Sequence, residues 1–312
     1  MLRDPQVNRS EGEKYLLCRP KGGLTDNLCQ MAKCWMYAKK YHRTIIFDTE
    51  QSAGFYRPFD QSFEFLESRP QVGVKVLSSE FHSEMDEMNV FPHVLKGRVS
   101  SYPSQFVKNK NFVDVETSVQ LTFDFDRAYG ETLLVHEHCG RNNHALGFLS
   151  MLKMKSELKE EVIKRLSPCR EVKNYKAVVI RHNNDYQSNY LEFLETISKD
   201  CAGEDVLVCS DNIHVIKDAM NYLSESRVIT LDSSPDTEGE GFAFYGKRAS
   251  ASIRHQLHIK GISDLIGLGA ASQLFACPLN HHAGPKESGF VVLAKQLNQN
   301  KGVIDQLLSK PS

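Results

Sequence analysis

The start of the chain places a strand, a glycine turn, a helix and a second strand in direct succession. Residues 14–19 (KYLLCR) have the composition of a buried strand, and a helical pattern over residues 24–41 follows the turn at residues 20–23. Residues 43–48 (RTIIFD) form the next predicted strand. Two strands joined through a helix run parallel, because the crossover returns the chain to the same end of the sheet. The pattern therefore predicts an α/β fold with a parallel sheet.

The second half of the chain repeats this alternation. An amphipathic helix predicted over residues 153–166 ends at Ser167 and Pro168, and a new buried strand begins near Lys176. We therefore predict two Rossmann-like domains, residues 1–168 and 169–312, that face each other across a cleft. The other predicted elements are strands at 74–77, 132–135, 176–181, 206–209, 227–231 and 273–277, and helices at 190–198, from 212 to about 223, at 262–271 and at 287–297.

The composition narrows the class of protein. With 41% hydrophobic residues, 25% charged residues and a formal net charge of −1, the chain of 312 residues is typical of a soluble globular protein and has no general field that would attract nucleic acid. Its eight cysteines include no CxxC pair, which favours reduced thiols over a disulfide framework. No segment has the pattern of a signal peptide or a membrane span, so we expect a cytoplasmic protein without an integral membrane segment.

A cation follows the buried strand of the second half. Residues 177–180 (AVVI) are apolar or small, and Arg181, His182 and two asparagines come directly after them. Ligands of open parallel sheets sit outside the carboxyl ends of the strands, and an arginine there offers a planar fork that fits a phosphate. A surface arginine at the end of a strand explains the same pattern. Taken alone, the segment leaves both interpretations open.

Gly22 and Gly23 precede the first helix. A glycine pair there lets a backbone or a phosphate approach the helix N-terminus closely. The segment lacks both the GxGxxG pattern and the lysine-serine ending of a P-loop, so taken alone it favours a tight turn without a binding role.

Two further clusters allow a functional and a structural interpretation. Aromatic residues gather between positions 55 and 65, where packing beneath a long loop competes with a platform for sugar stacking. His136 and His138 alternate after the strand predicted at 132–135, so on a strand they would share a face and could ligate a metal. No third ligand is suitably spaced, and a polar loop is the alternative. We expect no metal site.

Six segments in the same order resemble the fucosyltransferase superfamily with two Rossmann-like domains. The likeness is greatest to the bacterial nodulation-factor and the animal core α-1,6-fucosyltransferases. It extends over most of the chain, which makes it more specific than any one motif. The segments are GGLTDNLCQMAKCWMYAKKYHRTIIFD (22–48), ELKEEVIKRL (157–166), VVIRHNND (178–185), VLVCSDNIHVI (206–216), ISDLIGLGAASQLFACP (262–278) and ESGFVVLAKQL (287–297).

The resemblance implies a GT-B fold that binds a nucleotide-sugar donor and a saccharide acceptor. Residues 1–168 would form the acceptor-side domain and residues 169–312 the donor-binding domain. Arg181 would contact the diphosphate of GDP-fucose and stabilise the charge that builds on the leaving nucleotide. Asn184 and Phe290 would belong to the same donor site, and the glycine pair at 22–23 would border the diphosphate from the opposite domain.

Two positions carry the implied contacts to the rest of the nucleotide. Asp264 stands where the family has an aspartate that binds guanine, and helix N-capping is its alternative role. Ser288 would donate a hydrogen bond to a phosphate at the start of the last predicted helix, and plain N-capping is an equally good reason for a serine there.

The chain also departs from the family pattern. Val179 stands where the family's phosphate motif has a histidine, and Asn183 replaces a usual glycine. No DxD-like carboxylate pair is placed where a nucleotide would lie. An inverting displacement needs a base to deprotonate the acceptor hydroxyl, and Asp185 and Glu137 are the two candidates.

These features together predict an enzyme of glycan biosynthesis. We expect a glycosyltransferase that is independent of metals, uses no further cofactor and transfers fucose from GDP-fucose to a saccharide. The alternatives are a transferase for another nucleotide-sugar, and a non-catalytic module that binds a glycan or a nucleotide with the same fold.

Overall fold

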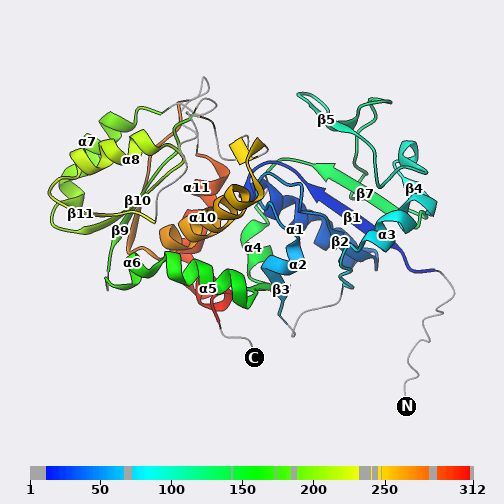
Figure 1. Ribbon diagram of the computed structural model, residues 1–312, viewed down its shortest axis with the longest axis horizontal. Coiled ribbons are helices and arrows are strands. Elements are labelled where there is room, and N and C mark those ends of the chain that lie inside the picture. Colours follow the sequence, from blue (N-terminus) through cyan, green and yellow to red (C-terminus); the bar gives the residue numbers. More distant parts are fainter. Residues whose placement is uncertain are drawn as a thin grey trace, which may run out of the picture. The chain divides into compact units, whose positions relative to one another are not determined.

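A computed structural model of the chain describes residues 12–66, 72–141, 143–172, 174–183, 188–231, 240, 245–246, 248–280 and 287–309 (Figure 1). The described residues form two compact units that are interleaved along the sequence. The first unit lies within Met1–Pro20, Gln30–Asp48 and Pro70–Cys139, and the second within Lys21–Cys29, Thr49–Arg69 and Gly140–Ser312. This division of the chain does not coincide with the predicted domain boundary between residues 168 and 169. That boundary between the two Rossmann-like domains therefore remains a prediction.

The first unit contains a parallel sheet centred on β1 (Tyr15–Pro20). Its strand order is β2-β1-β7-β4, with β2 at Thr44–Phe47, β7 at Leu133–His138 and β4 at Val90–Phe91. α1 (Leu24–Lys40) connects β1 to β2, as the sequence predicted. Leu17 of β1, Ile46 of β2 and Val135 of β7 are fully buried, because the apolar runs of these three adjacent strands meet one core.

Two sequence predictions in this unit were wrong. Residues 74–77 form no strand and contribute a single bridge, between Val74 and Ile45. β7 extends three residues beyond the predicted 132–135, so His136, Glu137 and His138 belong to the strand and not to a loop after it. Pairing with β1 along its whole length explains the extension, since Pro20 lies opposite His138.

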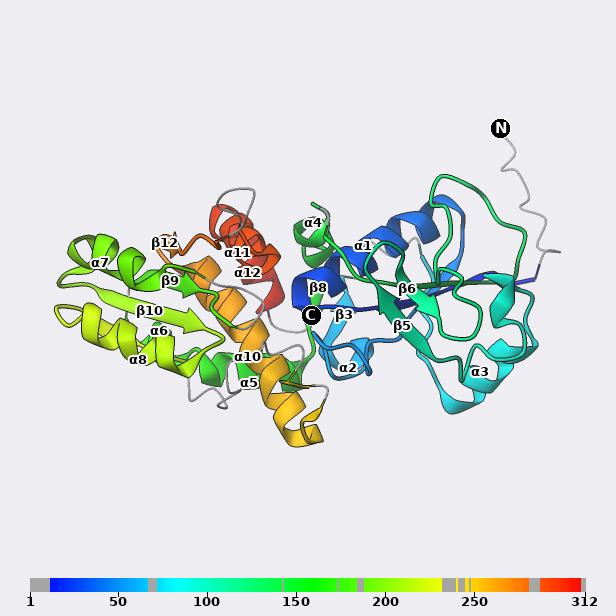
Figure 2. The same cartoon turned by 90° about the horizontal axis from the view of Figure 1, so that it is seen from above.

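Short elements occupy the segment between β2 and β7. β5 and β6 pair as an antiparallel hairpin, which is visible in Figure 2. The bounds are α3 at Ser79–Glu84, η1 at Met85–Glu87, η2 at His93–Leu95, β5 at Ser104–Val107 and β6 at Asn111–Asp114.

The second unit contains another parallel sheet, in the order β11-β10-β9-β12. The predicted alternation is confirmed here, because β9 is Lys176–Ile180, β10 is Asp205–Ser210, β11 is Arg227–Ile229 and β12 is Gln273–Ala276. α7 (Tyr190–Cys201) and α8 (Ile213–Tyr222) pack on the face that carries Val178 and Val208. α10 (Ala251–Ala270) packs on the opposite face, where a Cβ on Gly267 would lie 2.9 Å from Cδ2 of Leu207.

α10 begins far before the predicted start at residue 262. Ser250 caps it through a hydrogen bond from the Ile253 N–H, and the helix runs for 20 residues. The remaining elements of this unit are α2 (Phe59–Ser62), β3 (Phe63–Phe65), α4 (Ala145–Leu149), β8 (Leu152–Met154), α5 (Ser156–Arg165), α6 (Ser167–Arg170), α11 (Gly289–Gln299) and α12 (Lys301–Leu307).

The aromatic cluster between residues 55 and 65 is part of the interior of the second unit. Phe55, Phe59 and Phe63 are buried and in ring contact with one another. Phe148 of α4 adds a further ring against Phe59. Burial of the three phenylalanines supports the packing interpretation of the cluster.

No helix within the described ranges is both long enough and apolar enough to cross a membrane.

Candidate functional site

A pocket in the second unit brings together residues from both halves of the sequence. Four residues of the implied donor site line it, namely Gly23, Arg181, Asp264 and Phe290. Gly22 directly precedes the lining residue Gly23 in the chain. Ser288 is the N-cap of α11, the helix that carries Phe290. Asn184 and Asp185 lie outside the described residues. The rest of the lining is Leu24, Ala53, Gly54, Tyr56, Val179, Cys209, Ser210, Asp211, Leu257 and Gly261.

The glycine turn is held by the first turn of α1. Gly22 has φ +94°, a conformation that only glycine adopts without strain. The carboxylate of Asp26 accepts a hydrogen bond from the Gly23 N–H at 3.2 Å, so this carboxylate lies at the helix N-terminus. Burial raises the pKa of Asp26, against the opposing effects of Arg141 and of the Gly23 N–H. These contacts support the tight-turn interpretation of the glycine pair.

Gly54 packs against this turn and was not predicted from the sequence to do so. A Cβ on Gly54 would lie 2.5 Å from the carbonyl carbon of Gly23 and 2.5 Å from the Leu24 nitrogen. Because backbone atoms cannot give way, position 54 must be glycine for the turn to pack as it does. The sequence offers only a glycine in a loop as a signal.

Arg181 leaves the carboxyl end of β9 and meets Asp211, which follows the neighbouring strand β10. Nη2 of Arg181 lies 3.1 Å from Oδ2 of Asp211. The same carboxylate accepts hydrogen bonds from the His182 N–H, at 3.1 Å, and from the Asn183 side-chain amide. Asp211 is 2% exposed, so its negative charge is buried against the segment that carries Arg181. The pair fixes the guanidinium at the pocket wall.

Ser210, Asp211 and Asn212 stand at the start of the helix that was predicted from residue 212. Asn212 alone is the cap of α8, and its side chain accepts a hydrogen bond from the His214 N–H at 2.9 Å. Asp211 instead points toward Arg181. Sequence could not separate these roles, because Asp and Asn are both good N-cap residues.

Asp264 lies inside α10 and therefore does not cap a helix, so that alternative is wrong. The side chain is buried and pairs with Lys260, one turn earlier, whose Nζ lies 2.6 Å from Oδ2. No residue that the structure describes donates a hydrogen bond to Oδ1. A carboxylate oxygen without a donor, in a residue that lines a pocket, can accept an N–H from a ligand.

The N-terminus of α11 contributes Ser288 and Phe290. The Ser288 hydroxyl accepts a hydrogen bond from the Val291 N–H at 3.3 Å, so the capping role is present. Arg141 crosses this helix end, and its Nη1 donates to the Glu287 carbonyl at 3.3 Å. Its Nε lies 4.0 Å from Oδ1 of Asp26, which brings a second cation beside the glycine turn. No role for Arg141 was predicted from the sequence.

Val179 and Cys209 form an apolar wall of the pocket. They lie opposite each other in the register of β9 and β10, and they are 1% and 3% exposed. Burial raises the pKa of the Cys209 thiol well above its ordinary value, so the thiol is uncharged. The wall therefore has no titrating group at the position where the resemblance implies a histidine.

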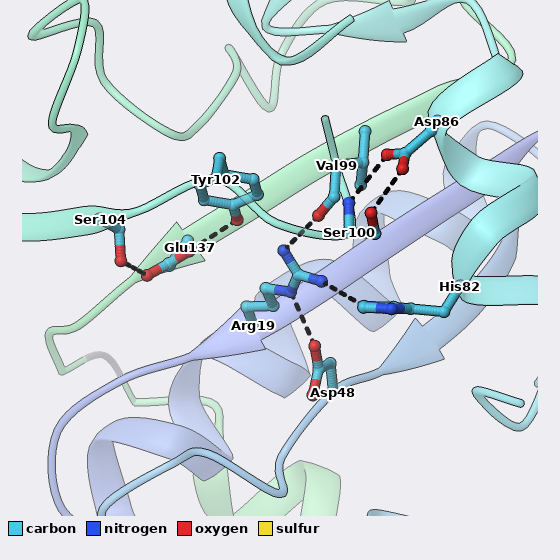
Figure 3. Close-up of polar contacts among 9 residues, drawn as sticks. All are labelled: Arg19, Asp48, His82, Asp86, Val99, Ser100, Tyr102, Ser104 and Glu137. Carbon is cyan, nitrogen blue, oxygen red and sulfur yellow. Dashed lines mark hydrogen bonds and ion pairs between the residues drawn. The ribbon is translucent and has the colours of Figure 1, made fainter. Parts of the chain in front are cut away.

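Glu137 belongs to the polar cluster of the first unit, shown in Figure 3. Its carboxylate accepts a hydrogen bond from the Tyr102 hydroxyl at 2.6 Å and another from the Ser104 hydroxyl. Arg19 lies beside this pair, over the ring of Tyr102, and donates from Nε to Asp48 at 2.7 Å. The cluster joins the carboxyl ends of three neighbouring strands. Glu137 is 2% exposed, and two hydroxyl donors already engage it.

The two histidines of β7 stack with ring centroids 5.4 Å apart, so they share a face as expected. Nδ1 of His136 lies 2.7 Å from the Thr122 hydroxyl, and its Nε2 lies 2.8 Å from Oε1 of Gln30. Burial lowers the pKa of His136 well below its ordinary value. In the ranges that the structure describes, no group of three or more His, Cys, Asp or Glu side chains is arranged to hold a metal ion.

Comparison with known proteins gives a likeness in structure only. No protein-family profile matches the sequence, and no curated protein matches it. The crystal structure of fucosyltransferase NodZ from Bradyrhizobium has a TM-score of 0.59 at 16% identity, over 91% of this chain and 93% of its own. POFUT1 in complex with GDP has a TM-score of 0.55 at 12% identity, over 93% of this chain and 96% of its own. The chain therefore has the α/β fold of GT-B type found in the fucosyltransferase superfamily.

Proposed function

We propose that this protein is a glycosyltransferase that takes fucose from GDP-fucose and transfers it to a saccharide. The observation that carries the proposal is the pocket of the second unit, which has Arg181 and Asp264 in one lining. A cation and a carboxylate in one pocket complement a ligand with a negative diphosphate and a base that offers N–H donors. GDP has both features. A NodZ α-1,6-fucosyltransferase structure soaked with GDP-fucose shares the fold, which supports this donor.

Arg181 supplies the charge that the reaction needs. As the bond between fucose and the nucleotide breaks, negative charge grows on the departing diphosphate. A guanidinium that is already in place stabilises this charge without reorganisation, which is the usual source of a large rate enhancement. Asp211 holds Arg181 through the ion pair at 3.1 Å and so limits the rotamers of its long side chain. We propose that this arginine, without a divalent metal, is sufficient for the leaving group.

The acceptor hydroxyl must lose a proton when it attacks the sugar from the opposite face. A carboxylate would take that proton in an inverting displacement. Asp185 and Glu137 remain the two candidates. The engagement of Glu137 with Tyr102 and Ser104 favours Asp185, because an acceptor hydroxyl would have to displace one of these donors from Glu137.

Nucleotide titration tests the proposed donor. Isothermal calorimetry with GDP, UDP, ADP and CMP should give the tightest binding for GDP. Incubation of GDP-fucose with the protein should also release GDP slowly without an acceptor, and EDTA should not abolish this release. Preference for UDP or CMP would exclude GDP-fucose. Loss of activity in EDTA, with recovery on addition of magnesium or manganese, would exclude the metal-independent mechanism.

A second candidate is a transferase for a different nucleotide-sugar. Val179 favours it, because an apolar side chain replaces the implied histidine in the lining of the pocket. The same titration separates the two candidates. GDP binding without release of GDP from GDP-fucose would instead support a non-catalytic binding module, provided that saccharide acceptors do not restore turnover.

A further inference from the structure

Lys260 and Asp264 form an ion pair that is buried on both sides. Lys260 is 4% exposed and Asp264 is 6% exposed, and they lie one turn apart on α10. Nζ of Lys260 lies 2.6 Å from Oδ2 of the carboxylate. Oδ1 has no donor among the residues that the structure describes, and Asp264 lines the pocket together with Leu257 and Gly261 of the same helix. Lys260 thus holds one oxygen of the carboxylate, while the other has no hydrogen-bond donor among the described residues.

Lys260 is a cation in contact with the buried carboxylate of Asp264. A carboxylate that is removed from water without a cation beside it favours its protonated, neutral form. Within the part of the chain that the structure describes, no second cation forms an ion pair with Asp264. Cys169 and Cys209 face Asp264, and burial raises the pKa of both thiols, with the charge of Asp264 adding to the effect. Arg165 is directed to the Leu231 carbonyl and Arg181 to Asp211.

The protonation state decides which base the carboxyl group can pair with. An ionised carboxylate only accepts hydrogen bonds, whereas the protonated acid offers one donor and one acceptor. The pairing edge of guanine presents two neighbouring N–H donors, N1–H and the 2-amino group, and so matches the ionised form. Adenine presents an acceptor, N1, beside its 6-amino donor, and so matches the neutral acid.

We propose that Lys260 sets the base preference of this pocket by keeping Asp264 ionised and turned with Oδ1 toward the ligand. Lys260 is a positioning residue, because it acts through Asp264 and does not line the pocket itself. The inference rests on the proposed function, since it assumes that the pocket binds a nucleotide whose base reaches Asp264. It adds the residue that would make the pocket reject adenine.

The experiment compares GDP and ADP affinities by calorimetry in the wild type and in Lys260→Met. We expect the wild type to prefer GDP by on the order of 100-fold, the scale that one buried polar group left unpaired produces. In Lys260→Met the ratio of GDP affinity to ADP affinity should fall at least ~10-fold. ADP should bind this variant more tightly than it binds the wild type, because a neutral Asp264 can pair with adenine. Lys260→Arg keeps the cation and should restore the ratio.

Lys159→Met is the matched control. Lys159 is also buried, at 8% exposed, but its Nζ donates to the Ser309 carbonyl and it does not line the pocket. Its replacement should lower the thermal unfolding temperature while leaving the ratio of GDP to ADP affinity unchanged. A general loss of stability would therefore not imitate the effect expected for Lys260→Met.

Further variants keep the inference falsifiable if Lys260→Met does not fold. Lys260→Gln removes the charge but keeps a hydrogen-bond donor, and the ratio should fall in the same way. In an Asp264→Asn background, which is already neutral, Lys260→Met should not change the ratio further. A wild type without preference for GDP would overturn the proposed function itself. A wild type that prefers GDP, together with Lys260→Met or Lys260→Gln that keeps this preference, would overturn the role of Lys260 alone.

Discussion

Arg141 lies across the space that the missing side chain of Gly289 leaves open. A Cβ built on Gly289 would be 2.4 Å from Cδ of Arg141, so alanine at position 289 must displace the arginine. Arg141 reaches both the Glu287 carbonyl and Asp26 along this path, and thereby connects the start of α11 with the glycine turn.

Gly289→Ala should therefore destabilise the protein, although alanine is the better helix former. We expect a loss of about 1–2 kcal/mol in the free energy of unfolding, the usual cost of overpacking, measured by denaturant titration. Gly302→Ala in α12 is the matched control. A Cβ there meets nothing within 4 Å, so this variant should be stabilised by roughly 0.5–1 kcal/mol. Equal effects of the two substitutions would contradict the packing of Arg141.

Arg181→Ala and Asp211→Asn should reduce turnover of GDP-fucose through the same defect. Loss of one preorganised donor costs at least ~100-fold in kcat, so we expect that scale for Arg181→Ala. Asp211→Asn weakens the contact that orients the arginine and should cost ~10-fold or more by the same mechanism. Because both act through one guanidinium, the double variant should be no slower than Arg181→Ala.

Arg227→Ala controls for the removal of an arginine from the same sheet. Arg227 pairs with Asp205 at the surface, and its side chain is 64% exposed. Turnover in this variant should match the wild type. Circular dichroism would verify folding in every case, and normal turnover in a folded Arg181→Ala protein would refute the assignment of this residue.

The two candidate bases make opposite predictions about stability and activity. Glu137→Gln replaces one acceptor oxygen by an NH2 group that faces either the Tyr102 or the Ser104 hydroxyl. Leaving one buried polar group badly paired should cost about 1–3 kcal/mol of stability, while turnover per folded molecule persists. Asp185→Asn should abolish turnover with saccharide acceptor but keep GDP affinity. The reverse pattern would make Glu137 the base.

His258 should make the protein sensitive to acid. Burial, and next the charge of Arg57, lower the pKa of His258 to about 3 in the folded protein from the ordinary 6.5. Below pH 6.5 the unfolded chain therefore binds a proton that the folded protein does not. The free energy of unfolding should fall by about 1.4 kcal/mol for each pH unit between about 6 and 4, and this contribution is complete above pH 6.5.

Urea titrations at several pH values measure this slope. The Ser62 hydroxyl lies 3.1 Å from Nε2 of His258, so the side chain of His258→Gln can still pair with it. This variant should take up about one proton fewer on unfolding in acid, which makes the slope of stability against pH shallower. His214→Gln is the control, since His214 is exposed on α8 and its loss should leave the slope unchanged. An unchanged slope in His258→Gln would show that His258 is not the group responsible.

The local sequence pattern was sufficient to predict the strands of the second unit and the position of Arg181 at the end of one of them. Buried β-branched runs such as residues 177–180 form strands wherever two faces are covered, and a polar residue directly after such a run stands at the carboxyl edge of a parallel sheet. The α/β class, most of the second-unit elements and the cap at Ser288 follow from interactions within a few residues of one another. This is why the sequence alone determined them.

Tertiary structure decided which of these residues share a pocket and with what charge. Gly54 contacts the glycine turn, and Asp211 turns from a capping position to Arg181, through neighbours that are distant in sequence. The start of α10 at Ala251 was missed because its first turns are polar, and only packing of the later turns on the sheet makes the whole helix stable. Lys260 is an ordinary helical lysine in sequence. Its burial beside Asp264 is a property of the fold, because only the folded chain removes that pair from water.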